Sequence, residues 1–307
     1  MKTFNNKVIF TLFACLTWQS FALAKDSKSW EKNVPDSKQD LLSIQAPTLD
    51  TVQGSLTIEN NTLLEEIRFT SLEQVIQNVR IASNARLSTI EIDSFGYVSG
   101  SFTVENNDLL EDLSIISMTG VGGFVTLSDN DRLKNISMNA VDTVNGYLNV
   151  VNNEQLEVLE APLLSLLNGT IKIQDSGNNL AINLTSLQNI NGSITIRDSD
   201  VDSISLTQLR NVDQSISFIN NSTLSQIDLS ATETIGTGLS IHNNPALSQL
   251  ETTALERVDG SINIYNNINI RLNQDDFNAL NKQATKMRVP MSTYCRTKLT
   301  QDLEPTE

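Results

Sequence analysis

Apolar residues recur along most of the chain at one fixed spacing. From Gly54, apolar side chains alternate with polar ones at Leu56 and Ile58, and a second alternating stretch follows around Ile67 and Phe69. The same pattern returns every 23 residues, with apolar residues at nearly all equivalent positions. Such a period predicts a repeat architecture in which each copy is one structural unit.

Ten copies of this unit run from Gln53 to about Leu272. One of them, residues 191–212, is shorter by one residue. No copy carries an insertion of more than one residue. A half-copy precedes the first full one and keeps the same apolar spacing: Ile44, Ala46, Leu49 and Val52. The pattern therefore favours one long repetitive domain over two average ones.

Each copy has two alternating segments that are too short for helices, and alternation predicts β-strands. In the first segment, Ser55 and Thr57 point away from the side that carries Leu56 and Ile58. One copy cannot bury its own apolar side, so the copies must stack and each strand must pair with its equivalent in the next copy. The predicted fold is all-β, a parallel β-solenoid of about ten coils and roughly 50 Å in length at ~4.8 Å per coil.

A recurring asparagine is the most conspicuous polar position of the repeat. It can be interpreted as a ligand-binding row of amides, or as a structural ladder between coils. We favour the ladder, because Asn tolerates the left-handed conformation at a corner and its side chain bonds neighbouring backbone amides. The glycine before the first strand predicts a corner with positive φ or a close backbone approach. Eight of the ten copies carry the asparagine: Asn61, Asn84, Asn107, Asn130, Asn153, Asn221, Asn244 and Asn267.

The full pattern, N-x-x-L-x-x-I-x-F-x-x-L-x-x-V-x-G-x-L-x-I, resembles the receptor L-domain, a leucine-rich-repeat-like β-helix of growth-factor-receptor ectodomains and fungal cell-wall proteins. Residues 64–69 are also similar to an ordinary leucine-rich repeat, but Leu72 stands at the next apolar step and the usual Asn is missing. The resemblance covers about 220 residues. It implies a non-catalytic binding or surface-organising role, and the disulfides of the receptors are absent here.

Residues 1–24 predict a secretory signal peptide. Lys2 and Lys7 precede an apolar stretch, and residues 22–24 form a small-residue cleavage site. The apolar stretch is shorter than the ~20 residues of a membrane span, and we expect no span elsewhere. We therefore predict an exported protein that is secreted, periplasmic or at the cell surface. Whether Cys15 is lipidated stays open.

The remaining boundaries follow from composition and register. Residues 25–40 are polar and predict a linker, and the solenoid domain occupies 41–272. Beyond Leu272 the register is lost. Residues 275–284 predict a short helix that ends before Pro290 and covers the last coil. We assign residues 273–307 to this C-terminal helical cap and tail.

Composition and charge exclude several classes of function. The formal net charge is −15, from 36 acidic and 21 basic residues, which argues against nucleic-acid binding. A single histidine, His242, and two cysteines leave too few side chains for a zinc site or a His-based triad. We expect no cofactor and no metal, and we expect His242 to be a surface residue without a partner.

The copies are uniform and leave no long loops for a catalytic cleft. We therefore predict that the protein is not an enzyme, with a polysaccharide-acting β-helix enzyme as the alternative.

The outward positions of the first strand form columns on a flat face. The middle column is rich in threonine, which raises ice binding as a further alternative, but Arg80 and Lys172 interrupt it. Phe124, Tyr147 and Val151 lie in the flanking columns on neighbouring coils. They form the predicted ligand-binding patch, because aromatic side chains on a flat sheet can stack on sugars or anchor a protein.

One corner is unusually acidic, with Asp175 expected one coil away from three further aspartates: Asp198, Asp200 and Asp202. The three resemble the start of a calcium loop, but Ser203 stands where an EF-hand requires glycine. A looser calcium site shared between coils stays open. Taken together, the sequence predicts an exported, non-catalytic protein that binds a protein or glycan partner, or organises a surface, through flat solenoid faces.

Overall fold

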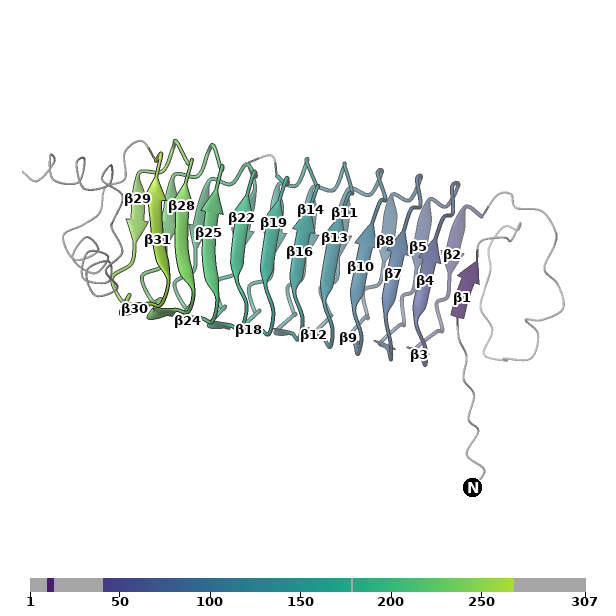
Figure 1. Cartoon of the computed structure of the whole chain (residues 1–307). Coiled ribbons are helices and arrows are strands. Elements are labelled where there is room, and N and C mark those ends of the chain that lie inside the picture. Colours follow the sequence, from purple (N-terminus) through teal and green to yellow (C-terminus); the bar gives the residue numbers. More distant parts are fainter. Residues whose placement is uncertain (1–9, 14–40, 178, 268–307) are drawn as a thin grey trace, which may run out of the picture.

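The computed structural model describes residues 10–13, 41–177 and 179–267, and these contain only β-strands and the turns between them. Figure 1 shows the coils stacked into a long rod. The predicted parallel β-solenoid of about ten coils is thereby confirmed. The predicted linker, the C-terminal cap and tail, the last residues of the solenoid domain and most of the signal peptide lie outside the described residues.

One long sheet runs the length of the rod. Its strands are parallel, and equivalent residues pair at the predicted spacing, as Leu56 does with Val79. Strand β1 comes from the predicted signal peptide and pairs with β4. In spatial order the strands are β1 (Phe10–Phe13), β4 (Leu56–Glu59), β7 (Val79–Ala82), β10 (Phe102–Glu105), β13 (Val125–Ser128), β16 (Leu148–Val151), β19 (Ile171–Gln174), β22 (Ile194–Arg197), β25 (Ser215–Ile219), β28 (Gly238–His242) and β31 (Ser261–Tyr265).

The second predicted strand of each copy also forms, but the row that these strands make is divided into three sheets. Backbone pairing is interrupted between β8 and β11 and again between β20 and β23. The three sheets are β2 (Ser43–Gln45), β5 (Glu66–Arg68) and β8 (Thr89–Glu91); then β11 (Asp112–Ser114), β14 (Asn135–Ser137), β17 (Val158–Glu160) and β20 (Ala181–Asn183); then β23 (Ser203–Ser205), β26 (Gln226–Asp228) and β29 (Gln249–Glu251).

Each coil has a third strand that the sequence pattern did not predict. These strands are only two residues long, so they contain a single inward residue and show no alternation. They form a ten-stranded sheet: β3 (Thr51–Val52), β6 (Gln74–Val75), β9 (Tyr97–Val98), β12 (Gly120–Val121), β15 (Thr143–Val144), β18 (Leu166–Leu167), β21 (Asn189–Ile190), β24 (Asn211–Val212), β27 (Thr234–Ile235) and β30 (Arg257–Val258).

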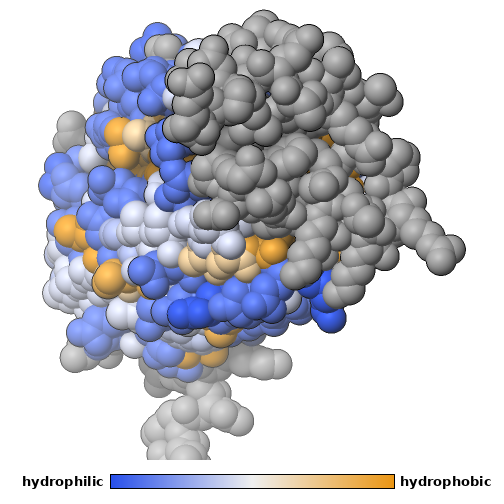
Figure 2. Space-filling view, turned by 90° about the vertical axis from the view of Figure 1, so that its left-hand side faces the viewer, coloured by the Kyte–Doolittle hydropathy of each residue, from blue (hydrophilic) through white to orange (hydrophobic). Residues whose placement is uncertain are grey.

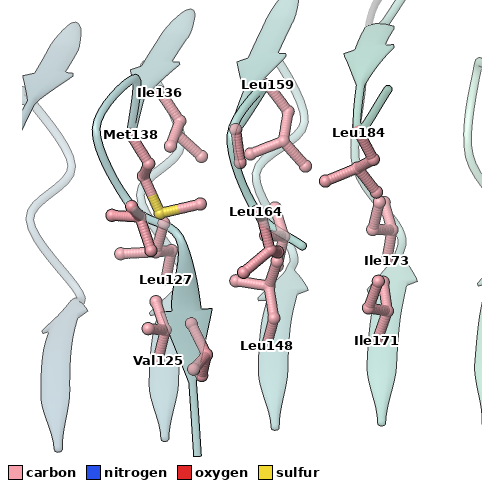
Figure 3. Close-up of a cluster of buried hydrophobic side chains, with 14 of the residues drawn as sticks. Val125, Leu127, Ile136, Met138, Leu148, Leu159, Leu164, Ile171, Ile173 and Leu184 are labelled. Atoms are coloured by element: carbon pink, nitrogen blue, oxygen red, sulfur yellow. The ribbon is translucent and has the colours of Figure 1, made fainter. Parts of the chain in front are cut away.

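The inward residues of all three strands form one aliphatic core, which extends from Ile44 to Ile264. Figure 3 shows part of it, with Val125, Leu148 and Ile171 stacked from coil to coil. All three side chains are buried. The alternation read from the sequence therefore corresponds to burial, because each strand turns every second side chain into the rod.

The recurring asparagines form the predicted ladder. The backbone N–H of Asn107 donates to Oδ1 of Asn130 at 3.1 Å, and Nδ2 of Asn130 donates to the carbonyl oxygen of Val104 at 3.1 Å. Two copies lack the asparagine, and there Ser176 and Ser199 continue the chain of bonds. These buried amides are occupied by the backbone, which leaves none of them for a surface ligand.

The prediction that these asparagines adopt the left-handed conformation is wrong. Positive φ belongs to the residue immediately before them, as in Asn106 at 54° and Asp129 at 55°. At this corner one residue adopts the left-handed conformation and the buried Asn after it makes the hydrogen bonds. The glycine before the first strand lies at another corner and is required by close approach, since a Cβ on Gly169 would lie 2.6 Å from the carbonyl oxygen of Gly146.

The short copy loses its residue at one corner. Ser176 and Ser199 are 23 residues apart, whereas Ser199 and Asn221 are 22 apart. The next strands, β23 and β26, are again 23 residues apart. The missing residue therefore belongs to the turn around Asp200, beside the interruption between β20 and β23.

Candidate functional site

Phe124 and Tyr147 stack on each other in front of the long sheet. Their ring centroids are 4.6 Å apart and the ring planes differ by 10°. The backbone N–H of Phe124 donates to Oγ of Ser101, and the carbonyl of Tyr147 accepts from Val125, so register holds the two rings together. Both side chains are half-buried. The structure thus brings together two of the three residues of the predicted patch.

Val151, the third predicted residue, lies apart from the stacked rings. It is the last residue of β16, whereas Tyr147 precedes that strand, and Asn149 faces outward between them. The residues paired with Val151 are Ser128 and Gln174, both polar. The apolar surface at this face is therefore the aromatic pair, with Val151 as an isolated neighbour in another column.

Tyr97 is an outward aromatic residue that sequence reasoning did not include. It belongs to the unpredicted strand β9 and is 37% exposed. Its ring lies against the bare backbone of Gly120 on the next coil, where a Cβ would lie 3.3 Å from Cε2 of the ring. Tyr97 and Gly120 are 23 residues apart and therefore equivalent in the repeat. Because the sequence pattern did not predict a strand here, it could not show that these two residues face outward.

A second stack lies near the C-terminal end of the described chain. His242 and Tyr265 have ring centroids 4.5 Å apart and planes that differ by 6°, and Ile219 precedes them in the same column. The prediction that His242 has no partner is therefore wrong. Its Nδ1 is buried without a hydrogen-bond partner, and burial lowers the pKa of the imidazole.

Arg80, in the middle column of the face, is ion-paired with residues on both neighbouring coils. Arg80 binds Glu59 at 3.1 Å and Glu105 at 2.6 Å, across three successive coils. An ordered threonine array is therefore interrupted by an ion-pair network. Figure 2, turned by 90° from Figure 1, shows apolar residues on the visible surface as small separate patches among hydrophilic ones.

The acidic corner forms an open hollow of about 420 Å³ beside the short copy, lined by Glu154, Asp175, Asp198 and Asp200 among others. Asp198 binds Arg197 at 2.6 Å and accepts a hydrogen bond from Asn220. The Asn220 bond and the Arg197 charge hold the pKa of Asp198 below its ordinary value. In the described part of the chain, no three His, Cys, Asp or Glu side chains gather closely enough to hold a metal ion.

No helix within the described ranges is long and apolar enough to cross a membrane. Comparison with family models, curated proteins and solved structures finds no match for this chain. What the fold defines is a class, the parallel β-solenoids.

Proposed function

We propose that this chain is an exported, non-catalytic binding or surface-organising protein of the receptor L-domain type. Its flat solenoid faces bind a protein or glycan partner. The observation that carries the proposal is the Phe124–Tyr147 stack, which presents aromatic surface beside the hydroxyl and amide side chains of Ser101, Thr126 and Asn149. Half-buried aromatic groups on a rigid face lose little conformational entropy on binding, which makes them effective anchors.

A pull-down with residues 25–307 tests this proposal. The double variant Phe124→Ala/Tyr147→Ala should retain the partner at least about tenfold less well than the unchanged chain. Its melting temperature should fall by only a few degrees, because a stacked pair contributes about 1 kcal/mol. Leu163→Ala, which removes an apolar side chain that is 54% exposed elsewhere, is the matched control. Equal retention by all three proteins would refute the role of the stack.

Export is a separate part of the proposal and has its own test. The amino-terminal sequence of the protein recovered outside the cytoplasm should begin at Lys25. A chain that begins at Met1 in that fraction would contradict processing. Cleavage at that point removes β1 together with the signal peptide, so β4 would lack this pairing strand in the processed protein.

A polysaccharide-acting enzyme is the alternative. The acidic hollow is the one feature that favours it, since glycoside hydrolysis requires a pair of carboxyl groups with different pKa values. Asp198, however, has its pKa lowered, which suits an ion-paired anion and not a general acid. Reducing-sugar release from a glycan panel that is abolished by replacing Asp198, Asp200 and Asp202 with alanine would favour the enzyme over the binding protein.

A further inference from the structure

The outward aromatic side chains of the described solenoid are concentrated at one corner. Among residues 41–177 and 179–267, four aromatic Phe or Tyr residues face outward, and three of them occupy three successive coils: Tyr97, Phe124 and Tyr147. The fourth, Tyr265, belongs to the last described coil. We call the region formed by Tyr97, Gly120, Phe124 and Tyr147 the aromatic corner.

The corner joins two sheets. Tyr97 and Gly120 belong to the two-residue strands β9 and β12, and Phe124 immediately precedes β13 of the long sheet (Figure 1). Gly120 and Phe124 are four residues apart, so their Cα atoms lie within about 14 Å of each other. Tyr97 rests on Gly120 and Tyr147 stacks on Phe124, and residues 121–123 join the two contacts, so the three rings lie on the two sides of one corner.

Gly120 lies beneath the ring of Tyr97, and backbone geometry does not require a glycine there. Its φ is not positive, and an added Cβ would meet its nearest neighbours, Tyr97 and the carbonyl of Thr143, at 3.3 Å. In the two following coils the same position carries Thr143 and Leu166. The absence of a side chain at Gly120 therefore lets the ring of Tyr97 lie on the backbone of the next coil, and an added methyl group would shift the ring.

The side chains in register with the rings are polar and uncharged, and the charged Lys172 lies one coil further along the middle column, in register with Asn149. On the coils that flank the stacked pair, the equivalent residues are Ser101 and Thr170. The next outward residues on the strands of the pair are Thr126 and Asn149. All four side chains end in hydroxyl or amide groups. The residues in register with Tyr97 and Gly120 are Gln74 and Thr143. The positions in register with the rings therefore offer hydrogen bonds and no charge, whereas specific binding of a charged ligand needs a complementary charge.

We propose that the aromatic corner is a binding site for an uncharged glycan. This inference rests on the proposed binding function and names its ligand class. A pyranose ring has a C–H face that packs on aromatic carbon and a rim of hydroxyl groups that bond to Ser, Thr, Asn and Gln side chains. Protein-binding hot spots are enriched in arginine as well as in aromatic residues, and no arginine stands in register with the three rings.

Titration of residues 25–307 with soluble glycans of known composition tests the assignment. The uncharged probes are a β-glucan, an α-glucan and a mannan, and the anionic probes are polygalacturonate and alginate. At least one uncharged glycan should bind. Its dissociation constant should rise about tenfold or more in Tyr97→Ala and in Phe124→Ala/Tyr147→Ala. Gly120→Ala should weaken binding in the same direction while the chain stays folded, because the added methyl group reaches only 3.3 Å contacts.

Tyr265→Ala is the matched control, since Tyr265 is 38% exposed on the same long sheet but lies outside the aromatic corner. It should bind the glycan within about twofold of the unchanged chain. The assignment is overturned if no uncharged glycan binds, if the anionic probes bind equally well, or if Tyr265→Ala weakens binding as much as Tyr97→Ala. A protein partner that depends on Phe124 and Tyr147 but not on Tyr97 would also overturn it, while leaving the proposed binding function intact.

Discussion

Single side chains join one coil to the next. Asn130 illustrates this, because its Oδ1 accepts from the backbone of Asn107 and its Nδ2 donates to Val104 and Ser128. All these groups are shielded from water. Removing the side chain leaves a buried N–H and buried carbonyl groups without partners. The resulting loss of folding free energy is larger than the net free energy that the hydrogen bonds contribute.

We expect Asn130→Ala to lower the stability of the solenoid by about 3 kcal/mol, and Asn130→Ser by roughly half as much. Serine is tolerated because Ser176 Oγ already accepts from the backbone N–H of Asn153 in the same ladder. Urea unfolding followed by circular dichroism measures the loss. The control is Asn149→Ala in an outward position, and equal stability of the Asn149 and Asn130 alanine variants would contradict the prediction.

His242 makes stability depend on pH. Burial against Tyr265 lowers its pKa below 6.5, so the folded chain favours the neutral imidazole. Its contribution is therefore complete above about pH 6.5 and is lost as pH falls towards the lowered value in the folded state. The melting temperature of the unchanged chain should fall relative to that of His242→Phe between about pH 7.5 and pH 5. Parallel melting curves over this range would contradict the prediction.

At the scale of strands and corners, close backbone contact decides which substitutions fit. Gly120 and Gly122 differ in this respect although they lie on one coil. A Cβ at Gly122 would lie 2.2 Å from the carbonyl oxygen of Ser99, whereas the nearest atoms to a Cβ at Gly120 are 3.3 Å away. The first contact requires the backbone to move and the second requires only a small adjustment.

Gly122→Ala should therefore lose more than about 2 kcal/mol and Gly120→Ala less than about 1 kcal/mol. For a domain of this size each kcal/mol shifts the melting temperature by roughly 2–4 °C, so thermal unfolding separates the two variants. If Gly120→Ala proves as damaging as Gly122→Ala, the inference that Gly120 is not needed for packing is wrong.

On the scale of the whole molecule, a solenoid is held together only by contacts between neighbouring coils, and its stability is close to a sum of these interfaces. Strand pairing of the second row is interrupted at two interfaces, and the one between the coils of β20 and β23 is the more irregular. It lacks the strand pairing of the second row, retains an isolated bridge between Leu180 and Val201, and adjoins the short copy. This interface is expected to open before its neighbours.

Amide hydrogen exchange should reveal that difference. Residues 180–205 should exchange faster than the equivalent residues 134–160, where β14 and β17 pair without interruption. The regular coils act as the internal control within one sample. Uniform protection along the rod would show that the interruption does not weaken the interface.

The inward half of the architecture was predictable in detail. Positions such as Leu56, Ile58 and Ile67 were assigned to the core from alternation and period alone, and all are buried. The short copy was also recognised. The third strand of each coil was not predicted, because a strand of two residues, such as the one that contains Tyr97, is too short to show alternation of apolar and polar residues. Prediction also failed where two adjacent residues share one corner, as Asn106 and Asn107 do.

The 23-residue period is sufficient to establish the solenoid, its parallel pairing and its aliphatic core, because burial selects the same residue type at every turn. Contacts between outward side chains carry no such periodic signal, since water accepts almost any polar residue there. That Phe124 stacks on Tyr147, that His242 stacks on Tyr265 and that Val151 stands apart therefore follow from strand register and corner geometry in the folded chain.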